Sequence, residues 1–344
     1  MNTFGNHFTF TSFGESHSAA IGGVLDGVPA GIRINLDMIR QALDRRAGRS
    51  PLPNEPYGEA DRSSGTRKEI VNTLGVSARA KNEADEVEWL SGVLDGVTLG
   101  TPIAFLIRNR DARPEDYEAL KHSFRPAHAD STYMAKYGIR DWRGGGRASA
   151  RETAARVVAG TIAQQMLRKQ GITISARLTQ VGAATHEEEF PTEIDRYRRE
   201  GDSIGGIVTC EVNGLPAGLG EPIFDKLQAH LAFAIMSINA CKGFDYGSGF
   251  DGVTLPGSVA NARSGGMLGG ITDGTTLTFR CVFKPTPSTP KAFAQMQNYK
   301  IVNDKIVNDK IVNRSDACVA VRAVPVVEAM TALVLADFAL PQNT

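Results

Sequence analysis

The spacing of apolar and polar residues predicts short strands and long helices in one chain. Runs with strand character lie at 8–13, 21–25, 87–97 and 102–107, with further strand-like pieces in the glycine- and threonine-rich stretch 253–282. Apolar residues three and four positions apart predict helices at 36–45, 148–169, 225–240 and 326–338, the first of them capped by Asn35. Paired strands together with long apolar helices favour an α+β layered fold over a doubly wound parallel sheet.

Two stretches interrupt this pattern. The chain from Gly48 to about Ala84 is polar and contains three prolines, which indicates a long surface loop or an insertion at about 49–80. Residues 300–314 read KIVNDKIVNDKIVNR, and a period of five fits neither a strand nor a helix. We therefore expect a repeat-bearing loop at 298–314. Because the composition does not shift sharply anywhere, the pattern predicts a single domain over 1–344.

The overall charge limits the classes of partner. Lys plus Arg and Asp plus Glu number 38 each, so the formal net charge of the 344 residues is zero. No global field attracts the chain to nucleic acid or to a membrane surface, and we expect neither as a partner. An anionic ligand must therefore be held by a local cluster of cations.

Cysteine spacing and the chain ends indicate an ordinary cytoplasmic protein. The four cysteines lie far apart without a C-x-x-C pair, so we expect reduced, mostly buried thiols and no metal site. The first ten residues do not resemble a secretory signal. The apolar run near the C-terminus is broken by Glu328 and Asp337, which makes it too polar and too short to cross a bilayer.

The strongest candidate for chemistry is the stretch 137–156, YGIRDWRGGGRASARETAAR. Four arginines surround three glycines where the long helix begins, and exposed N–H groups, the helix dipole and guanidinium groups all favour an anion there. An exposed, charged helix start is one alternative reading. An RNA-binding RGG segment is another, but a neutral chain with few interleaved aromatic residues does not resemble such a surface.

Two histidines and a pair of glycine-rich stretches are further candidates. His128 lies between Arg125 and Asp130, and His17 lies on a turn between two strands, so each could face a cleft. Taken alone, each histidine is more often a hydrogen-bonded structural residue than a catalyst. The stretches 242–252 and 263–270, followed by FKPTPS at 283–288, could cradle a cofactor phosphate, although their spacing is neither that of a P-loop nor that of a dinucleotide fingerprint.

Taken together and in this order, these stretches resemble the chorismate synthase family over 2–340. The motifs include FGESHS at 13–18, FRPAHAD at 124–130, DWRGGGRASARET at 141–153, GDSIG at 201–205, PAGLGEP at 216–222, MSINACKG at 236–243 and KPTPS at 284–288. The resemblance implies a homotetramer of three-layer β-α-β sandwiches. It also implies the anti 1,4-elimination of phosphate from 5-enolpyruvylshikimate 3-phosphate to give chorismate, with reduced FMN that is not consumed.

The resemblance also implies roles for particular residues. His17 would donate a proton to the leaving phosphate, His128 would keep the reduced flavin in the right protonation state, and Asp316 would work with the flavin in removing the ring proton. A substrate with one phosphate and two carboxylates carries about four negative charges, and six arginines are candidates to bind it: Arg46, Arg49, Arg125, Arg147, Arg151 and Arg322. The flavin contacts implied are Arg147, Ala148, Ser149, Asn239, Ala240, Gly269, Gly270, Lys284, Pro285, Thr286, Pro287, Ser288 and Arg314.

Departures from the family pattern keep an alternative open. The family's GRHDPC motif reads NRSDAC at 313–318, directly after the repeats, and such a change could move Asp316 and Arg314. A catalytically silent homologue that still binds flavin or oligomerises is therefore the alternative function. The sequence also leaves open how the flavin is reduced, either by this chain with NADPH or by a separate flavin reductase.

Overall fold

Two antiparallel sheets form the outer layers of the structure. The computed structural model describes residues 1–49, 77–294 and 316–339. The first sheet has the order β1-β2-β3-β7-β4 and comprises β1 (Thr3–Phe4), β2 (Thr9–Phe13), β3 (Ala20–Asp26), β7 (Ile103–Arg108) and β4 (Val87–Trp89). The second has the order β10-β13-β9-β8 and comprises β10 (Cys241–Tyr246), β13 (Leu277–Phe283), β9 (Gly206–Asn213) and β8 (Thr173–Val181). Two hairpins are separate, β5 (Val93–Leu94) with β6 (Val97–Thr98) and β11 (Met267–Leu268) with β12 (Ile271–Thr272).

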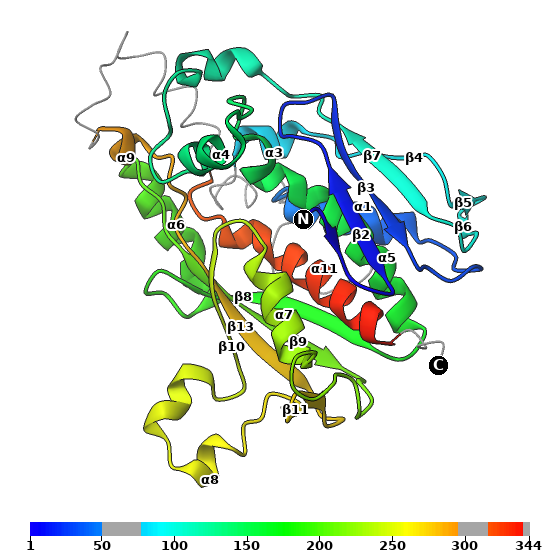
Figure 1. Ribbon diagram of the computed structural model, residues 1–344. Helices are drawn as coiled ribbons and strands as arrows, with labels where there is room; N and C mark the ends of the chain where they lie inside the picture. Colours follow the sequence, from blue (N-terminus) through cyan, green and yellow to red (C-terminus); the bar gives the residue numbers. More distant parts are fainter. Residues whose placement is uncertain (50–76, 295–315, 340–344) are drawn as a thin grey trace.

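Long helices fill the space between the sheets (Figure 1). They are α1 (Leu36–Arg46), α5 (Thr153–Arg168), α7 (Leu227–Met236) and α11 (Ala320–Ala339). Helix α11 packs against α1, α5 and α7 and also against β8 and β9, whereas α5 packs against β2 and β3 of the other sheet. A helix that is apolar around most of its circumference, as α11 is, needs cover on every side. The three-layer β-α-β sandwich and the α+β class are therefore confirmed.

Shorter helices lie around this sandwich. They are α3 (Ala78–Asn82), α4 (Asp130–Tyr137), α6 (Phe190–Arg199), α8 (Gly257–Ala260) and α9 (Pro290–Ala294). Helix α3 lies near the end of α1, because Arg49, just beyond α1, donates to the carbonyl groups of Ala80 and Glu83.

A buried ion pair joins two helices and one strand, α1, α11 and β8. Arg45, in the last turn of α1, donates from Nη1 and Nη2 to the carboxylate of Glu328 in α11 at 2.7 and 3.0 Å. The same carboxylate accepts the backbone N–H of Ala176 in β8 at 2.9 Å. Removing one partner of such a buried pair leaves an uncompensated charge, so the pair fixes how α1, α11 and β8 pack.

Most of the predicted elements are present with shifted ends. Helix α1 begins after Asn35, whose side chain accepts the N–H of Met38, as predicted. The predicted helix 148–169 starts later, at Thr153. The extended backbone of Ser149, with ψ 141°, separates the 3₁₀ turn Gly146–Ala148 from the 3₁₀ turn Ala150–Glu152, and the second turn leads directly into α5. The predicted helix 326–338 starts earlier, at Ala320, and contains Pro325.

Other predictions were wrong or incomplete. Strands β8 and β9 were not predicted, although β8 alternates between exposed and buried positions. The polar stretch 48–84 contains helix α3, so it is not a loop throughout. Residues 50–76 and the repeats at 300–314 lie outside the described residues, and the single domain with its two loops remains a prediction.

The positions of the cysteines agree with a further expectation. The four cysteines, Cys210, Cys241, Cys281 and Cys318, are all buried free thiols. Burial raises the pKa of Cys318 to about 12, so this thiol stays protonated and unreactive at neutral pH. Within the described ranges, no helix has the length and hydropathy of a membrane span.

The contact between α5 and α11 generates a prediction about stability. A Cβ at Gly160 would lie 2.4 Å from both Cα and Cβ of Ala329, and backbone atoms cannot move aside without separating the helices. Replacing Gly160 with Ala should therefore lower the free energy of unfolding by about 1–3 kcal/mol, despite the better helix propensity of alanine. Urea denaturation followed by circular dichroism measures this change.

Gly257→Ala is the matched control, because Gly257 is also helical and the nearest atom to its added Cβ lies 3.8 Å away. An unchanged or higher stability for Gly160→Ala would contradict this account of the helix contact.

Candidate active site

A cavity of about 510 Å³ opens where the ends of several distant segments meet. Its lining comes from the loop after β2, the end of α1, α3 and its flanks, the segments 125–132 and 144–151, the β10 and β13 ends, and the start of α11. This volume lies within the range of small-molecule sites. The fold thus brings together residues that are more than 250 positions apart in the sequence, such as Ser16 and Arg322.

His128 lies on the cavity wall in a cluster of charged groups. Arg125 forms a bidentate ion pair with Asp130, and its Nη2 also lies 2.9 Å from His128 Nδ1. Asp130 Oδ1 is 3.2 Å from the same ring nitrogen. Burial lowers the pKa of His128, and the Arg125 charge lowers it further although Asp130 opposes this. The imidazole is therefore neutral at neutral pH.

The carboxylate beside it stays ionised. Burial alone would raise the pKa of Asp130, but hydrogen bonds from His128 and Arg125 together with the Arg125 charge outweigh burial and lower it strongly. Asp130 also accepts the backbone N–H of Arg125 at 3.0 Å. A fixed negative charge therefore orients both the guanidinium and the imidazole toward the cavity.

His17 lies directly behind the wall rather than on it. His17 is only 4% exposed, whereas its neighbours Ser16, Tyr117 and Gly144 line the cavity. The ring packs edge-on against Tyr117, with ring centroids 5.0 Å apart. His17 and His128 are therefore on the same side of the molecule, at one cavity.

The three glycines before α5 have a role that the sequence did not predict. A Cβ at Gly144 would lie 2.1 Å from Cε1 of His17, and one at Gly145 would lie 2.7 Å from Cε1 of His128. Both glycines have positive φ, 59° and 87°. Gly144 and Gly145 therefore let the His17 and His128 rings pack directly against the backbone. This close packing accounts for both glycines, and a bound anion is not needed to explain them.

Four of the six predicted substrate arginines line the cavity, and two do not. The four are Arg46, Arg125, Arg151 and Arg322. Arg49 instead donates to Asp44 at 2.7 Å and to the carbonyls of Ala80 and Glu83, which ties α1 to α3. Arg147 donates to Ser12 Oγ at 2.7 Å and to the carbonyl of Gly14 at 3.2 Å.

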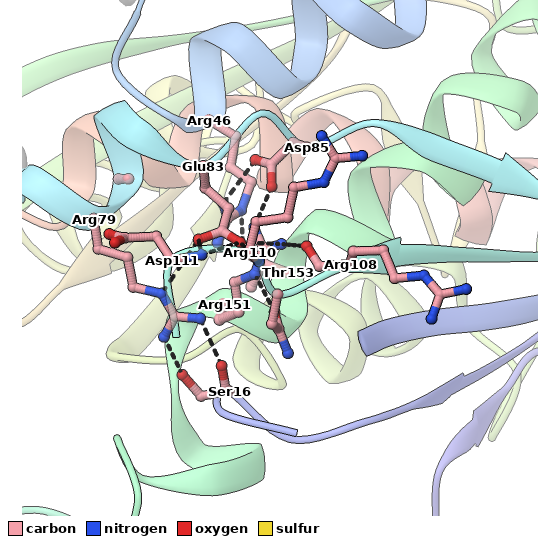
Figure 2. A network of polar contacts seen from close by, with 12 residues as sticks. Ser16, Arg46, Arg79, Glu83, Asp85, Arg108, Arg110, Asp111, Arg151 and Thr153 are labelled. Carbon is pink, nitrogen blue, oxygen red and sulfur yellow. Dashed lines mark hydrogen bonds and ion pairs between the residues drawn. The ribbon is translucent and has the colours of Figure 1, made fainter. Parts of the chain in front are cut away.

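Figure 2 shows a polar network that includes the cavity-lining residues Arg46, Glu83 and Arg151. Arg46 and Arg151 both approach Asp85, Arg151 in a direct pair and Arg46 with Nη1 at 3.7 Å from Oδ2. Burial alone would raise the pKa of Asp85, but Arg151 and Arg46 outweigh burial and lower it. Burial lowers the pKa of Arg46, and the Arg322 charge lowers it further. One buried carboxylate thus offsets part of the repulsion between clustered cations.

Glu83 anchors the same wall (Figure 2). Its carboxylate accepts the backbone N–H groups of Arg110 at 2.6 Å and Asp111 at 3.2 Å. It also lies 3.6 Å from Arg79 and 3.7 Å from Arg151. The segment that follows α3 is therefore joined to both the cationic cluster and the loop after β7.

Asp316 lies in the cavity wall beside the start of α3. Its Oδ2 accepts from Arg322 Nη1 at 2.7 Å, and its Oδ1 accepts the backbone N–H of Ser77 at 2.9 Å. Arg322 in turn donates from Nε to the carbonyl of Arg46 at 2.9 Å. Asp316 therefore lies at the cavity despite the altered motif, with its carboxylate held on both oxygens.

Most of the residues expected to bind flavin lie on one part of the wall. These are Ala148, Ser149, Asn239, Ala240, Lys284, Thr286, Pro287 and Ser288. Pro285 and Arg147 are not in the lining, Gly269 and Gly270 lie in the turn of the β11–β12 hairpin, and Arg314 lies outside the described residues.

The described lining carries an excess of positive charge in a neutral protein. It contains six cations and two carboxylates: Arg46, Arg79, Arg125, Arg151, Lys284 and Arg322 against Glu83 and Asp316. Even when Asp85 and Asp130 behind the wall are included, two cations remain in excess. The arrangement therefore favours a ligand with several negative charges.

Sequence reasoning missed several lining residues. Ser77, Arg79 and Glu83 fall in or beside the stretch assigned to an insertion, and Tyr117 stands in a short 3₁₀ segment that carries no motif. The SARAKNEAD sequence at 77–85, with two carboxylates and an arginine after a Ser cap, was the signal that could have indicated an ordered, charged element.

Comparison with known proteins identifies the family. The profile described as chorismate synthase matches residues 8–340. The chain belongs to the chorismate synthase family. Chorismate synthase of Phocaeicola vulgatus is 40% identical over 384 residues, covering 100% of this chain and 99% of that protein. Chorismate synthase of Methylobacillus flagellatus is 43% identical over 370 residues, covering 98% and 95%. A crystal structure of chorismate synthase matches with a TM-score of 0.70 at 27% identity, covering 97% of this chain and 92% of that one.

Family membership fixes the class of activity. Chorismate synthases are carbon–oxygen lyases of aromatic amino acid biosynthesis, they act on a small molecule, and the family implies a reduced flavin cofactor. The lyase function is therefore favoured over a silent homologue.

The His128 cluster generates a prediction about pH. Because the fold holds the pKa of His128 below its ordinary value of 6.5, the stability that depends on the neutral ring is fully present above that value and decreases as the pH falls through it. Arg125→Gln should raise the pKa of His128, since a neighbouring positive charge is removed, and Asp130→Asn should lower it further. NMR titration of the ring protons measures both shifts, with His128→Gln used to assign the signal. Shifts in the opposite directions would contradict the charge arrangement.

Proposed function

We propose that this cavity binds 5-enolpyruvylshikimate 3-phosphate together with reduced FMN and catalyses the anti 1,4-elimination that yields chorismate and phosphate. The observation that carries the proposal is the local excess of cations on a wall that also holds His128 and Asp316. A substrate with about four negative charges requires such an excess, and the neutral chain as a whole does not supply it.

The substrate would be held by the arginines of the lining. Arg46, Arg151 and Arg322 come from α1, the turns before α5, and α11, so their guanidinium groups approach from different elements. Arg46 is almost fully buried at 1% exposure and is fixed by bonds to Thr153 Oγ1 at 2.9 Å and the carbonyl of Ala150 at 2.6 Å. A preorganised cation of this kind neutralises a leaving phosphate without reorganisation.

The wall around 239–240 and 284–288 fits a flavin. Asn239 Oδ1 and Thr286 Oγ1 are buried and have no hydrogen-bond partner among the described residues, which suits a ligand with polar ring edges. Lys284 adds a cation and Ser288 a hydroxyl to the same part of the lining. When bound, a reduced flavin supplies electron density to the electron-poor transition state of the elimination.

The titratable side chains would handle the proton. Neutral His128 can donate or accept a hydrogen bond at the cavity without adding charge, and ionised Asp130 keeps it oriented. Asp316, held by Arg322 and by Ser77 N–H, is available as a base whose position is fixed. His17, behind the wall beside Gly144, would act at the leaving phosphate.

The remaining properties follow from the same proposal. We propose that the cofactor is FMN, that NADPH or a separate flavin reductase supplies its electrons, and that the chain acts in the cytoplasm as a homotetramer. The whole chain would act as a single domain. A silent flavin-binding homologue is less well supported, because Asp316 and Arg322 remain in the cavity wall despite the altered motif.

Anaerobic turnover tests the proposed function. With dithionite-reduced FMN, the protein should release one phosphate per substrate molecule without consuming flavin. Asp316→Asn should lower kcat by about 10²–10⁴-fold, the usual effect of removing a general acid or base. Arg177→Gln, on an exposed side chain of β8, is the control and should keep full activity. Tight FMN binding without phosphate release at any protein concentration would support the silent homologue instead.

A binding measurement tests the flavin wall separately. Lys284→Gln should weaken FMN binding by about tenfold. A hydrogen bond from a charged group contributes about 1.5 kcal/mol, and about 1.4 kcal/mol corresponds to a tenfold change in affinity. Quenching of flavin fluorescence on titration measures the affinity. Arg280→Gln changes a half-buried cation of β13, which pairs with Asp245 and is not in the cavity lining, and it should leave the affinity unchanged. Equal affinities in both variants and the parent protein would contradict this position for the flavin.

A further inference from the structure

Asn109 joins the turn that carries His17 to a guanidinium group of the cavity wall, and no sequence motif pointed to it. It follows β7 directly, and its backbone N–H donates to the carbonyl of Ala19 at 3.1 Å, which continues the pairing of β7 with β3. The first sheet therefore fixes the position from which the Asn109 side chain extends.

The side-chain amide uses its donor side on the His17 turn. Nδ2 donates to the carbonyl of Ser18 at 2.8 Å and to the carbonyl of Glu15 at 3.1 Å. These two residues flank Ser16 and His17 in the sequence. The turn is closed by its own bonds, because Ser18 N–H donates to the Glu15 carbonyl at 3.2 Å and Glu15 N–H donates to Ser18 Oγ at 3.1 Å. Asn109 therefore holds both ends of a compact turn.

The acceptor side of the same amide faces the cationic wall. Arg151 Nε donates to Asn109 Oδ1 at 2.9 Å. The other nitrogens of this guanidinium also bind protein groups, Nη1 the carboxylate of Asp85 (Figure 2) and Nη2 the carbonyl of Arg108 at 3.3 Å. Contacts to all three nitrogens fix the plane of the Arg151 guanidinium, which lines the cavity.

The two sides of the amide cannot be exchanged. A guanidinium only donates and a backbone carbonyl only accepts, so Oδ1 must face Arg151 and Nδ2 must face the turn. Arg79 and the carbonyl of Gly146 bind Ser16 in the middle of the turn, but neither of these contacts includes Arg151. One planar side chain of fixed polarity thus connects the turn directly to that guanidinium.

We propose that Asn109 is a positioning residue that sets the place of His17 relative to Arg151. The structural part of this role depends only on the contacts above. Its effect on catalysis rests on the proposed function, in which Arg151 binds the substrate and His17 acts at the leaving phosphate. Two groups that act on one ligand need a fixed separation, because a misplacement of about 1 Å can lower a rate about a hundredfold.

Two substitutions separate geometry from charge. Asn109→Asp keeps the size of the side chain and an oxygen for Arg151, but it places a second oxygen against the carbonyls of Glu15 and Ser18. Asn109→Ala removes the contacts to both partners and adds no charge. In an active enzyme, each should lower kcat by about tenfold to a hundredfold, the scale of a small misplacement, while FMN affinity changes less than twofold. Phosphate release at saturating substrate measures kcat, and flavin fluorescence measures the affinity.

Asn213→Asp is the matched control. Asn213 is exposed at the end of β9 and is not in the cavity lining, and its Oδ1 accepts from Thr276 Oγ1 at 2.8 Å, a bond that a carboxylate also accepts. This variant adds the same charge and should keep full kcat. A loss of kcat in Asn109→Asp without one in Asn109→Ala overturns the proposal, because charge rather than position would then be the cause.

A double-mutant cycle distinguishes positioning from a general loss of structure. If Asn109 acts through His17, Asn109→Ala should lower kcat less than twofold further in a His17→Gln protein. A general destabilisation lowers kcat by the same factor with or without His17. Equal factors in the two backgrounds therefore overturn the proposal.

NMR of the His17 ring tests the positioning role without turnover. The ring lies edge-on to Tyr117 with centroids 5.0 Å apart, so the shifts of its ring protons report movement relative to that aromatic ring. His17→Gln assigns the signals. Both Asn109 variants should shift them, and Asn213→Asp should not. Unchanged signals in a folded Asn109→Ala protein overturn the role of Asn109, and if this variant does not fold, the Asn109→Asp spectrum decides in the same way.

The two readouts separate this inference from the proposed function. An inactive parent protein whose His17 signals shift in the Asn109 variants supports the role of Asn109 and contradicts only the proposed function. An active parent protein whose His17 signals ignore both substitutions contradicts only the role of Asn109.

Discussion

The structure of the site depends on burying arginines beside one another. Arg46 and Arg151 approach the same carboxylate, Asp85, and Arg322 adds a further positive charge nearby. Removing cations from water costs several kcal/mol each unless they are paired, so the segment around Asp85 has to be held in place before the cavity can exist. Glu83, tied to two backbone N–H groups of the loop after β7, supplies that anchor.

The sandwich explains how distant motifs meet. The helical layer ends near the cavity, so the last turn of α1, the turns before α5 and the first turn of α11 all contribute side chains to one wall. The two histidines come from loops of the first sheet and its flank, and Gly144 and Gly145 let their rings approach the same backbone. A chain with zero net charge can still form a cationic site, because most of its carboxylates lie outside the cavity lining.

The sequence predicted much of this arrangement, and its failures have physical causes. Periodicity located α1 and the long helices, since buried helices show their apolar spacing directly. It did not locate the start of α5, because the extended backbone at Ser149 does not change the spacing of apolar residues from which the helix was predicted. The resemblance located His128, Asp316 and four arginines of the cavity, whereas Arg49 and Arg147 bind protein groups that only tertiary contacts reveal. Arg79 was missed because polar, proline-containing sequence precedes it and hides a short helix that is stabilised by its contacts rather than by its own propensity.

We propose that one cationic cavity holds the flavin and the polyanionic substrate in contact with each other. A crystal structure of the chain with oxidised FMN and 5-enolpyruvylshikimate 3-phosphate is the decisive experiment. Both molecules should lie in this cavity, with the flavin against Asn239 and Lys284 and the substrate phosphate bonded to at least two of Arg46, Arg151 and Arg322. Flavin bound at any other place, or a substrate phosphate that contacts none of these arginines, would contradict it.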